Sequence, residues 1–247
     1  MVNAVVLGAT RGIGRSLARQ MVQRGDRVFI LGRHVDDLAR SAADLDARGI
    51  AGTAVGFASC DLEDPTSFGP ALDAAAARLG RIDTVVVTAA MFATQATLEQ
   101  DTPFTSRLLT VNFTNTVLFC EDARRRLMTG GGGTLCVFSS VAGDRGRKPV
   151  VLYGAAKAGV SRYLEGLDHR FHADGLRVIC VKPGFVRTSM TAGLPEPPFA
   201  GNPDAVAADV LRAIDRGTAV VYTPPVWRLV MAVIRLLPRS VMRRVAF

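Results

Sequence analysis

A tyrosine and a lysine in the second half of the chain, Tyr153 and Lys157, are four residues apart. On a helix, this spacing places both side chains on one face. A phenol has an unperturbed pKa of about 10, and a nearby ammonium favours the phenolate. The pair therefore predicts a tyrosine whose pKa is lowered toward neutrality and which exchanges a proton with a carbonyl or alcohol oxygen. The alternative is a solvated helix face, and the rest of the chain must decide between the two.

A glycine-rich turn near the start of the chain favours the chemical interpretation. Residues 2–7 form a short apolar run typical of a buried parallel strand, and a helical pattern that ends at Gly25 follows. Between them stand Gly8, Gly12 and Gly14. In this position we expect Gly8 to permit a tight turn, Gly12 to admit a pyrophosphate and Gly14 to allow close helix–strand packing. The arrangement predicts a dinucleotide site.

The end of the second predicted strand, residues 27–31, indicates which dinucleotide is bound. Folds that prefer NAD carry an acidic residue near this place, where it accepts hydrogen bonds from the ribose 2′-hydroxyl. Here Gly32 and Arg33 occupy it, and Arg11 lies within the glycine turn. Guanidinium groups without a carboxylate favour a 2′-phosphate, so we predict NADP(H) over NAD(H). The alternative for Arg33 is a solvated turn residue.

Strand-like and helical segments alternate along the chain, which predicts an α/β fold with a doubly wound parallel sheet of the Rossmann type and about seven strands. After the third strand, Asp61 is expected to accept a hydrogen bond from an adenine amino group, and Leu62 to lie against the ring. We expect one catalytic domain over residues 1–223 and an amphipathic helical extension over residues 224–247. Besides those already given, the expected strands are 52–57, 82–88, 135–140 and 220–222, and the expected helices include 36–48 and 65–79.

Composition narrows the class of protein. The 247 residues have 49% hydrophobic and 21% charged side chains, as expected of a folded domain. We expect no signal peptide, no membrane-spanning helix and a cytoplasmic location. No spacing of histidines and cysteines suggests a metal site, and the thiols are expected to be inert, with Cys60 the least certain. The cysteines are Cys60, Cys120, Cys136 and Cys180.

These motifs resemble the short-chain dehydrogenase/reductase family over most of the chain. Ser140 precedes Tyr153 by 13 residues, the usual spacing of the family's active-site serine and tyrosine. The resemblance implies a catalytic set of Ser140, Tyr153, Lys157 and Asn112. One departure is that Thr88-Ala89-Ala90-Met91 replaces the family's Asn-Asn-Ala-Gly after the fourth strand. The cofactor-binding residues implied by the motifs and the resemblance together are Gly8, Thr10, Arg11, Gly12, Ile13, Gly14, Arg33, Asp61, Leu62, Ala89, Ala90, Tyr153, Lys157, Pro183, Gly184, Val186 and Thr188.

The resemblance also implies a reaction. Hydride passes between a nicotinamide and a carbonyl carbon, while Tyr153 gives a proton to the oxygen and Ser140 holds it by a hydrogen bond. Lys157 contacts the nicotinamide ribose, and Asn112 connects Lys157 to solvent through a water. Carbonyl reduction is the direction that NADPH favours.

Two segments outside these motifs predict the substrate and the location. Residues 189–202, rich in proline and glycine, correspond to the family's substrate lid, and their apolar members suggest an apolar substrate. An ordered surface loop is the alternative. The tail holds five arginines and no acidic residue, and Trp227 lies in its helical part, residues 226–237. A basic amphipathic helix is typical of a membrane surface, here the inner face of the plasma membrane. Packing on the body or on a partner subunit is the alternative. Because the charge of +8 is concentrated in this tail, nucleic acid is not an expected partner.

The tail and the segment 182–190 also resemble the decaprenylphosphoryl-2-keto-pentose reductase subgroup. This resemblance suggests a lipid-linked keto-sugar as substrate. The alternatives are a soluble reductase of 3-oxoacyl thioesters or small ketones, and a catalytically silent NADP(H)-sensing protein. The family's mode of pairing implies a homodimer or a homotetramer, formed through helices that begin near Pro103 and Tyr153.

Overall fold

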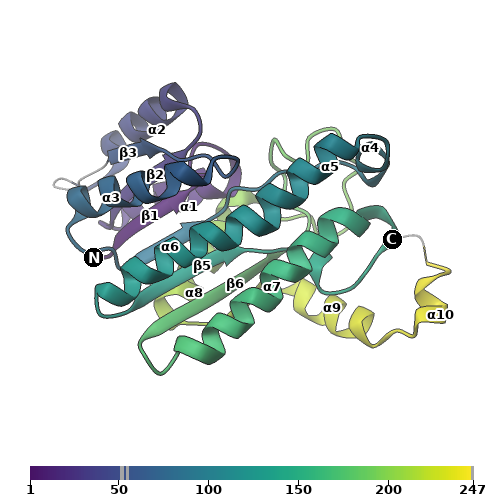
Figure 1. Cartoon of the computed structure of the whole chain (residues 1–247). Helices are drawn as coiled ribbons and strands as arrows, with labels where there is room; N and C mark the ends of the chain where they lie inside the picture. The colour runs from purple at the N-terminus through teal and green to yellow at the C-terminus, as the bar shows by residue number, and fades with distance from the viewer. Residues whose placement is uncertain (51–52, 54–55, 246–247) are drawn as a thin grey trace.

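A seven-stranded parallel sheet forms the centre of the computed structural model, which describes residues 1–50, 53 and 56–245 (Figure 1). The strand order is β3-β2-β1-β4-β5-β6-β7. Successive strands are added on one side of β1 up to β3 and on its other side from β4 onward, so the strand order reverses between β1 and β4. Doubly wound folds have this arrangement, and the predicted fold class is confirmed. The strands are β1 Asn3–Leu7, β2 Arg27–Gly32, β3 Gly56–Ser59, β4 Thr84–Val87, β5 Gly133–Phe138, β6 Leu176–Pro183 and β7 Val220–Thr223.

Helices cover both faces of the sheet because its central strands are apolar on both sides. One buried cluster joins the sheet to α1, α2 and α8, and a second joins it to α3, α6 and α7. The latter three helices cross the near face in Figure 1. These six helices are α1 Gly12–Gln23, α2 Val35–Arg48, α3 Phe68–Leu79, α6 Thr116–Thr129, α7 Val151–Phe171 and α8 Pro203–Arg216.

Several predicted boundaries differ from the structure. The predicted third strand, residues 52–57, falls partly outside the described residues, and β3 continues to Ser59. The helix expected from residue 65 starts with a 3₁₀ turn, Pro65–Ser67, before α3 begins. The strand expected to end at Ser140 ends at Phe138, because Ser140 instead caps a 3₁₀ turn and its Oγ accepts a hydrogen bond from the Ala142 amide at 3.1 Å.

The tail forms α9 Val226–Leu236 and α10 Arg239–Met242, at the lower right in Figure 1. Met231 and Ile234 of α9 are buried against Val141, so this helix packs on the body. Arg145 strengthens the contact, since its guanidinium donates a hydrogen bond to the Leu237 carbonyl at 2.7 Å. Within the described part of the chain, no helix is both long enough and apolar enough to cross a membrane.

Candidate active site

A cleft of about 1460 Å³ lies beyond the carboxyl ends of the strands and collects almost every residue singled out in the sequence. This is where ligands bind in doubly wound sheets. All the predicted cofactor-binding residues line it, and so do Ser140, Tyr153 and Lys157. Asn112 is the exception, because it is fully buried behind the wall of the cleft. Segments distant in the sequence thus meet at one edge of the sheet.

The glycine turn has the geometry that its sequence predicts. Gly8 has a φ of +94° and Gly12 a φ of +54°, values that favour glycine. A Cβ on Gly14 would collide with the Gly8 carbonyl, so α1 packs directly against the turn. Arg11 precedes the first helical residue, and its side chain does not cap the helix. The amide groups at the start of α1 are therefore available to an anionic group.

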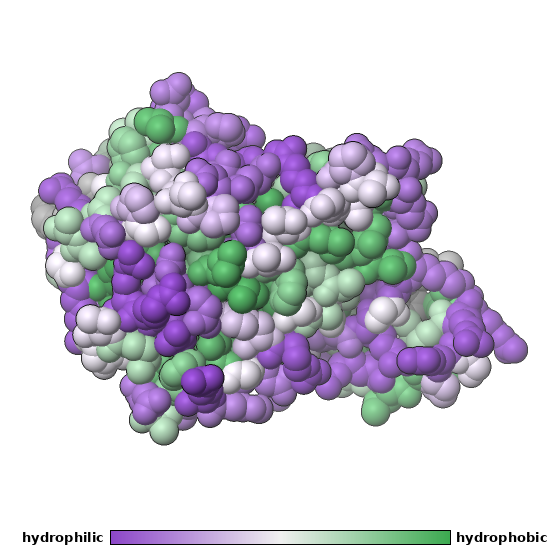
Figure 2. Space-filling view, in the orientation of Figure 1, coloured by the Kyte–Doolittle hydropathy of each residue, from purple (hydrophilic) through white to green (hydrophobic). Residues whose placement is uncertain are grey.

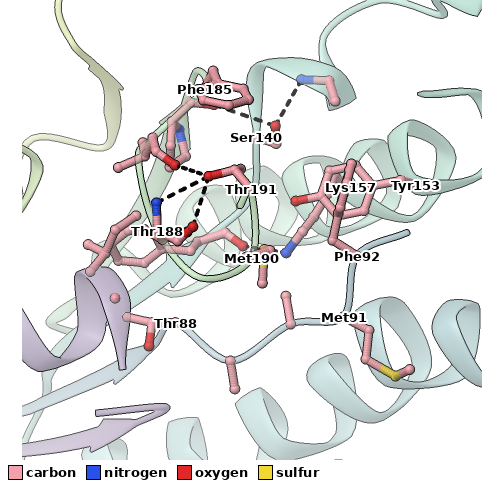
Figure 3. A pocket seen from close by; sticks show the side chains of 18 of the residues that line it. Thr88, Met91, Phe92, Ser140, Tyr153, Lys157, Phe185, Thr188, Met190 and Thr191 are labelled. Atoms are coloured by element: carbon pink, nitrogen blue, oxygen red, sulfur yellow. Dashed lines mark hydrogen bonds between the residues drawn. The ribbon is translucent and has the colours of Figure 1, made fainter. Parts of the chain in front are cut away.

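Tyr153 and Lys157 lie on the same side of α7, as their spacing predicts (Figure 3). The ammonium is 5.9 Å from the centre of the phenol ring and donates a hydrogen bond to the Phe138 carbonyl at 2.8 Å. Phe92 packs edge-on against the phenol, with ring centres 5.2 Å apart. These contacts fix the orientation of both side chains within the cleft.

The predicted acidification of Tyr153 is wrong for the protein without a ligand. Burial raises the pKa of Tyr153 to about 12, although a hydrogen bond with Ser140 acts in the opposite direction. Burial also lowers the pKa of Lys157 to about 8, so part of its charge is lost near neutral pH. Because desolvation disfavours both charged forms, it outweighs the attraction that the sequence suggests. Tyr153 is therefore a protonated donor at physiological pH.

Ser140 lines the cleft, whereas Asn112 is buried behind its wall. The Ser140 hydroxyl lies in the cleft and is 3.4 Å from the Pro183 carbonyl, which accepts its weak hydrogen bond (Figure 3). Asn112 lies in a π-helical segment, Thr110–Asn115. Its side-chain oxygen accepts from the Met91 amide and its nitrogen donates to the Met91 carbonyl, both at 2.7 Å. This side chain holds the loop after β4 rather than facing the cleft.

The end of the cleft near Arg11 and Arg33, away from Tyr153, contains acidic residues that the sequence interpretation overlooked. Arg11 pairs with Asp37 at 3.2 Å, and Arg33 pairs with Glu63 at 3.3 Å. Arg107 also binds Glu63 and lowers the pKa of that carboxyl. The expectation of guanidinium groups without carboxylates is therefore wrong, because α2 and the loop after β3 bring acidic side chains from elsewhere in the sequence.

The predicted adenine-binding residues lie beside these ion pairs. Leu62 is almost fully buried, and its carbonyl accepts a hydrogen bond from Asn115 at 2.6 Å. The Asp61 carboxyl accepts one from the Glu63 amide at 3.0 Å. Both residues line the cleft on a loop with a fixed conformation.

The predicted lid, residues 189–202, and the tail helix α9 line the end of the cleft away from Arg11 and Arg33. Thr191 donates to the Val186 carbonyl at 2.6 Å and accepts from the Thr188 amide at 3.1 Å, which orders the lid (Figure 3). Trp227 of α9 lies against Gly184, where a Cβ would overlap the indole. Trp227 thus lines the cleft instead of facing outward, as an interfacial anchor would.

Several cleft residues had no signal in the sequence. Asp37 and Glu63 were recognisable only as surface acids, and Phe92 and Arg147 belong to loops without a motif. The tail helix contributes Val230 and Ile234 in addition to Trp227, and Leu237 follows directly after its end. All of these residues reach the cleft through long-range packing, which spacing along the chain does not reveal.

The thiols take no part in this arrangement. Cys60, Cys120, Cys136 and Cys180 are all free and buried. Burial raises the pKa of Cys60 to about 12, so even the thiol nearest the cleft is inert at neutral pH. Over the residues that the structure describes, no cluster of histidine, cysteine and carboxylate side chains could hold a metal ion.

Fold and cleft define a dinucleotide-binding oxidoreductase, and comparison with known proteins identifies its family. The family profile described as short chain dehydrogenase matches residues 2–198. The chain is 35% identical over 240 residues to an uncharacterized oxidoreductase of Mycobacterium tuberculosis, covering 97% of this chain and 95% of the relative. It is 33% identical over 195 residues to a cis-4-hydroxycyclohexanecarboxylate dehydrogenase of Sinomonas cyclohexanicum, covering 78% and 76%.

Solved structures agree with the sequence relatives. A short-chain type dehydrogenase/reductase from Mycobacterium ulcerans superposes with a TM-score of 0.82 at 26% identity, over 89% of this chain and 87% of that one. The chain therefore belongs to the short-chain dehydrogenase/reductase family. It is an oxidoreductase of a family that uses NAD(H) or NADP(H) and acts on small carbonyl compounds.

Proposed function

We propose that the protein is an NADPH-dependent carbonyl reductase that converts a ketone to a secondary alcohol at Ser140, Tyr153 and Lys157. One observation carries the proposal: these three polar side chains line the same cleft as the glycine turn. The glycine turn fits a dinucleotide, because Gly12 has a positive φ and the amides at the start of α1 have no side-chain cap. When bound, the nicotinamide supplies the hydride.

Side chains of the protein donate the proton and bind the carbonyl oxygen of the substrate. Tyr153, with its pKa raised to about 12, keeps its proton at neutral pH and can donate it to the carbonyl oxygen. Ser140 donates a hydrogen bond to the same oxygen and stabilises the negative charge that develops there. Lys157 would contact the nicotinamide ribose, and Asn112 keeps the neighbouring loop in place through Met91.

The preference for NADP(H) rests on Arg11 and Arg33. Both line the cleft, and their side chains are 71% and 50% exposed, so each could turn toward a 2′-phosphate. Asp37 and Glu63 compete for them, but Glu63 has a second partner in Arg107. A dianionic phosphate offers more charge than either carboxylate does.

The substrate is proposed to be apolar over much of its length, since the lid and α9 line the cleft with Met190, Phe199, Trp227 and Val230. A polyprenyl-phosphoryl keto-sugar is one candidate. A soluble reductase of 3-oxoacyl thioesters or small ketones is the alternative within the enzyme class. The name of the Sinomonas cyclohexanicum relative describes the dehydrogenation of a cyclic alcohol, which favours alcohol–ketone chemistry.

We also propose that the tail touches an anionic membrane from the cytoplasmic side. Leu229, Val233 and Leu236 of α9 are 70%, 57% and 84% exposed, while arginines flank them. In Figure 2 the tail forms the lower right of the surface, with hydrophobic patches among hydrophilic side chains. Full-length protein should float with anionic liposomes more than a Leu229→Ser/Leu236→Ser variant does. Val35→Ser, on exposed α2, is the control.

The oligomeric proposal is a homodimer or a homotetramer. Phe113 and Leu118 are 39% and 47% exposed, and Val151 at the start of α7 is 52% exposed. These apolar side chains lie near the helices through which the family pairs. Sedimentation of Leu118→Asp against wild type would show whether this face holds subunits together.

Substitution of Tyr153 tests the reaction and separates an enzyme from a cofactor-sensing protein. Tyr153→Phe should lower turnover of a reducible ketone by about 10³-fold or more, with the Kd for NADPH within about threefold of wild type. Tyr163→Phe is the matched control, because Tyr163 lies on the same helix but bonds Glu121 outside the cleft. Wild-type turnover in Tyr153→Phe would contradict the mechanism. Absence of turnover with every ketone would favour the sensor.

A further inference from the structure

Arg147 is a cation in the cleft that forms no ion pair with any residue the structure describes. It lies between the 3₁₀ turn that begins at Lys148 and the loop after β5, and it lines the cleft beside Val150 and Tyr153. Its Nε atom is buried and has no hydrogen-bond partner among residues 1–50, 53 and 56–245. The two other guanidinium groups of the cleft, on Arg11 and Arg33, are both paired with carboxylates at the opposite end.

The carboxylate that acts on Arg147 is already held by other groups. Asp144 forms an ion pair with Lys182 at 2.6 Å and accepts a hydrogen bond from the Tyr222 hydroxyl at 2.6 Å. Lys182 bonds one carboxylate oxygen of Asp144 and Tyr222 bonds the other, so both oxygens have a partner. Asp144 therefore connects its loop to β6 and β7, and its negative charge is paired with the ammonium of Lys182 rather than with the guanidinium of Arg147.

The surroundings make this unpaired charge unfavourable in the absence of a ligand. Phe92, Val150, Trp227 and Ile234 line the same end of the cleft with apolar groups. Burial lowers the pKa of Arg147, which reflects the cost of keeping a guanidinium there. Arg147 is partly buried, and a charge at such a place is retained at least cost when an opposite charge satisfies it.

We propose that Arg147 binds an anionic group of the substrate, a carboxylate or a phosphate, while the apolar wall holds the carbon skeleton. A guanidinium presents paired N–H donors that match either group. The inference deepens the proposed carbonyl reduction by naming the class of substrate: a keto compound with an anion at a distance from the carbonyl. Arg147 is then a substrate-binding residue that selects among ketones.

Binding can be measured without turnover, because the chain has a single tryptophan and Trp227 lines this cleft. Three probes share one ring: 4-oxocyclohexanecarboxylate, its methyl ester, and the phosphate monoester of 4-(hydroxymethyl)cyclohexanone. Fluorescence titrations of the full chain loaded with NADP⁺, which has no hydride to give to a ketone, would yield Kd values for each probe when the protein is excited in the tryptophan band. We expect wild type to bind at least one anion at least tenfold more tightly than the ester, and the two anions separate carboxylate from phosphate.

The variants assign that preference to Arg147. Arg147→Gln should lose the preference for the anion and leave the Kd of the ester within about twofold, whereas Arg147→Lys should retain part of it. Lys148→Gln is the matched control, because Lys148 is adjacent, exposed and outside the cleft. Circular dichroism melts check that each variant is folded.

Two results would overturn the inference: a wild-type protein that binds the ester as tightly as both anions, or an Arg147→Gln variant that keeps the preference. The first result needs no variant, so it stands even if Arg147→Gln fails to fold. Binding of an anion without its reduction would instead refute the proposed function and leave the anion site intact.

Discussion

At the proposed cofactor end of the cleft, backbone geometry and paired charges hold the structure. At the proposed substrate end, apolar side chains surround Arg147, a guanidinium without an ion-pair partner in the described part of the chain. Gly8, Gly12 and Gly14 shape the first end through φ values and close contacts. At the second end, the tail helix and a loop contribute Trp227 and Arg147. The contrast suggests that cofactor binding tolerates little change near β1, while the substrate end can change without altering the sheet.

Among the substitutions that compare these two ends, the largest effect is expected in the glycine turn. Gly14→Ala places a methyl group against the Gly8 carbonyl and within 2.5 Å of Thr88 Oγ1. Because both neighbours are fixed, we expect the free energy of unfolding to fall by about 3 kcal/mol or more. We also expect NADPH binding to weaken by about 100-fold or more, since the first amides of α1 would shift. Denaturant unfolding and calorimetry measure the two quantities.

Gly166→Ala is the control for that substitution. Gly166 lies in α7, and a Cβ there would meet nothing within 4 Å. Alanine is favoured over glycine inside a helix, so stability should stay the same or rise by up to about 1 kcal/mol. If the two variants lose equal stability, close packing at the turn is not the reason for Gly14.

Lys157 lies between the two ends, and its burial predicts a pH dependence of stability. Its pKa is lowered to about 8 in the folded protein from 10.5 when exposed. Between these values the unfolded chain binds more protons, so the contribution of Lys157 to the free energy of unfolding rises with pH. The free energy of unfolding of wild type minus that of Lys157→Met should therefore increase by roughly 3 kcal/mol from pH 7.5 to pH 10.5.

Urea denaturation at both pH values gives that difference. Lys148→Met serves as control, because Lys148 is exposed and its substitution should give the same difference at both pH values. A constant difference for Lys157→Met as well would mean that Lys157 titrates as it does in water. The comparison of variants is needed because the buried thiols change stability in the opposite direction as pH rises.

Arg33 tests whether the paired charges at the cofactor end select NADPH. Arg33→Ser should weaken NADPH binding by about tenfold and leave NADH binding within about twofold, because only NADPH carries the 2′-phosphate. Arg48→Ser, in an exposed ion pair with Asp44, should change neither. Calorimetry with both dinucleotides measures the effect, and equal loss for both would remove Arg33 from the selection.

The smallest effect is expected at the tail. Trp227→Ala removes an indole from the substrate end, so KM for a bulky ketone should rise about three- to fivefold with the Kd for NADPH unchanged. Leu229→Ala is the control on the outer face of α9, since Leu229 is 70% exposed. Steady-state kinetics distinguishes them. An equal change in both variants would indicate a general effect of the helix rather than a contact with substrate.

The sequence by itself determined the parallel sheet, the glycine turn, the Tyr153–Lys157 face and the candidate site residues that reach one cleft. These features depend on local periodicity and on residues that take particular backbone conformations, which a linear sequence records. Tertiary structure alone decided the pKa of Tyr153, the carboxylates opposite Arg11 and Arg33, and the inward direction of Trp227. Those properties depend on desolvation and on contacts between distant segments, and spacing along the chain carries no information about either. Arg147 belongs to the second group, because a guanidinium is recognisable as unpaired only when all its neighbours are in place.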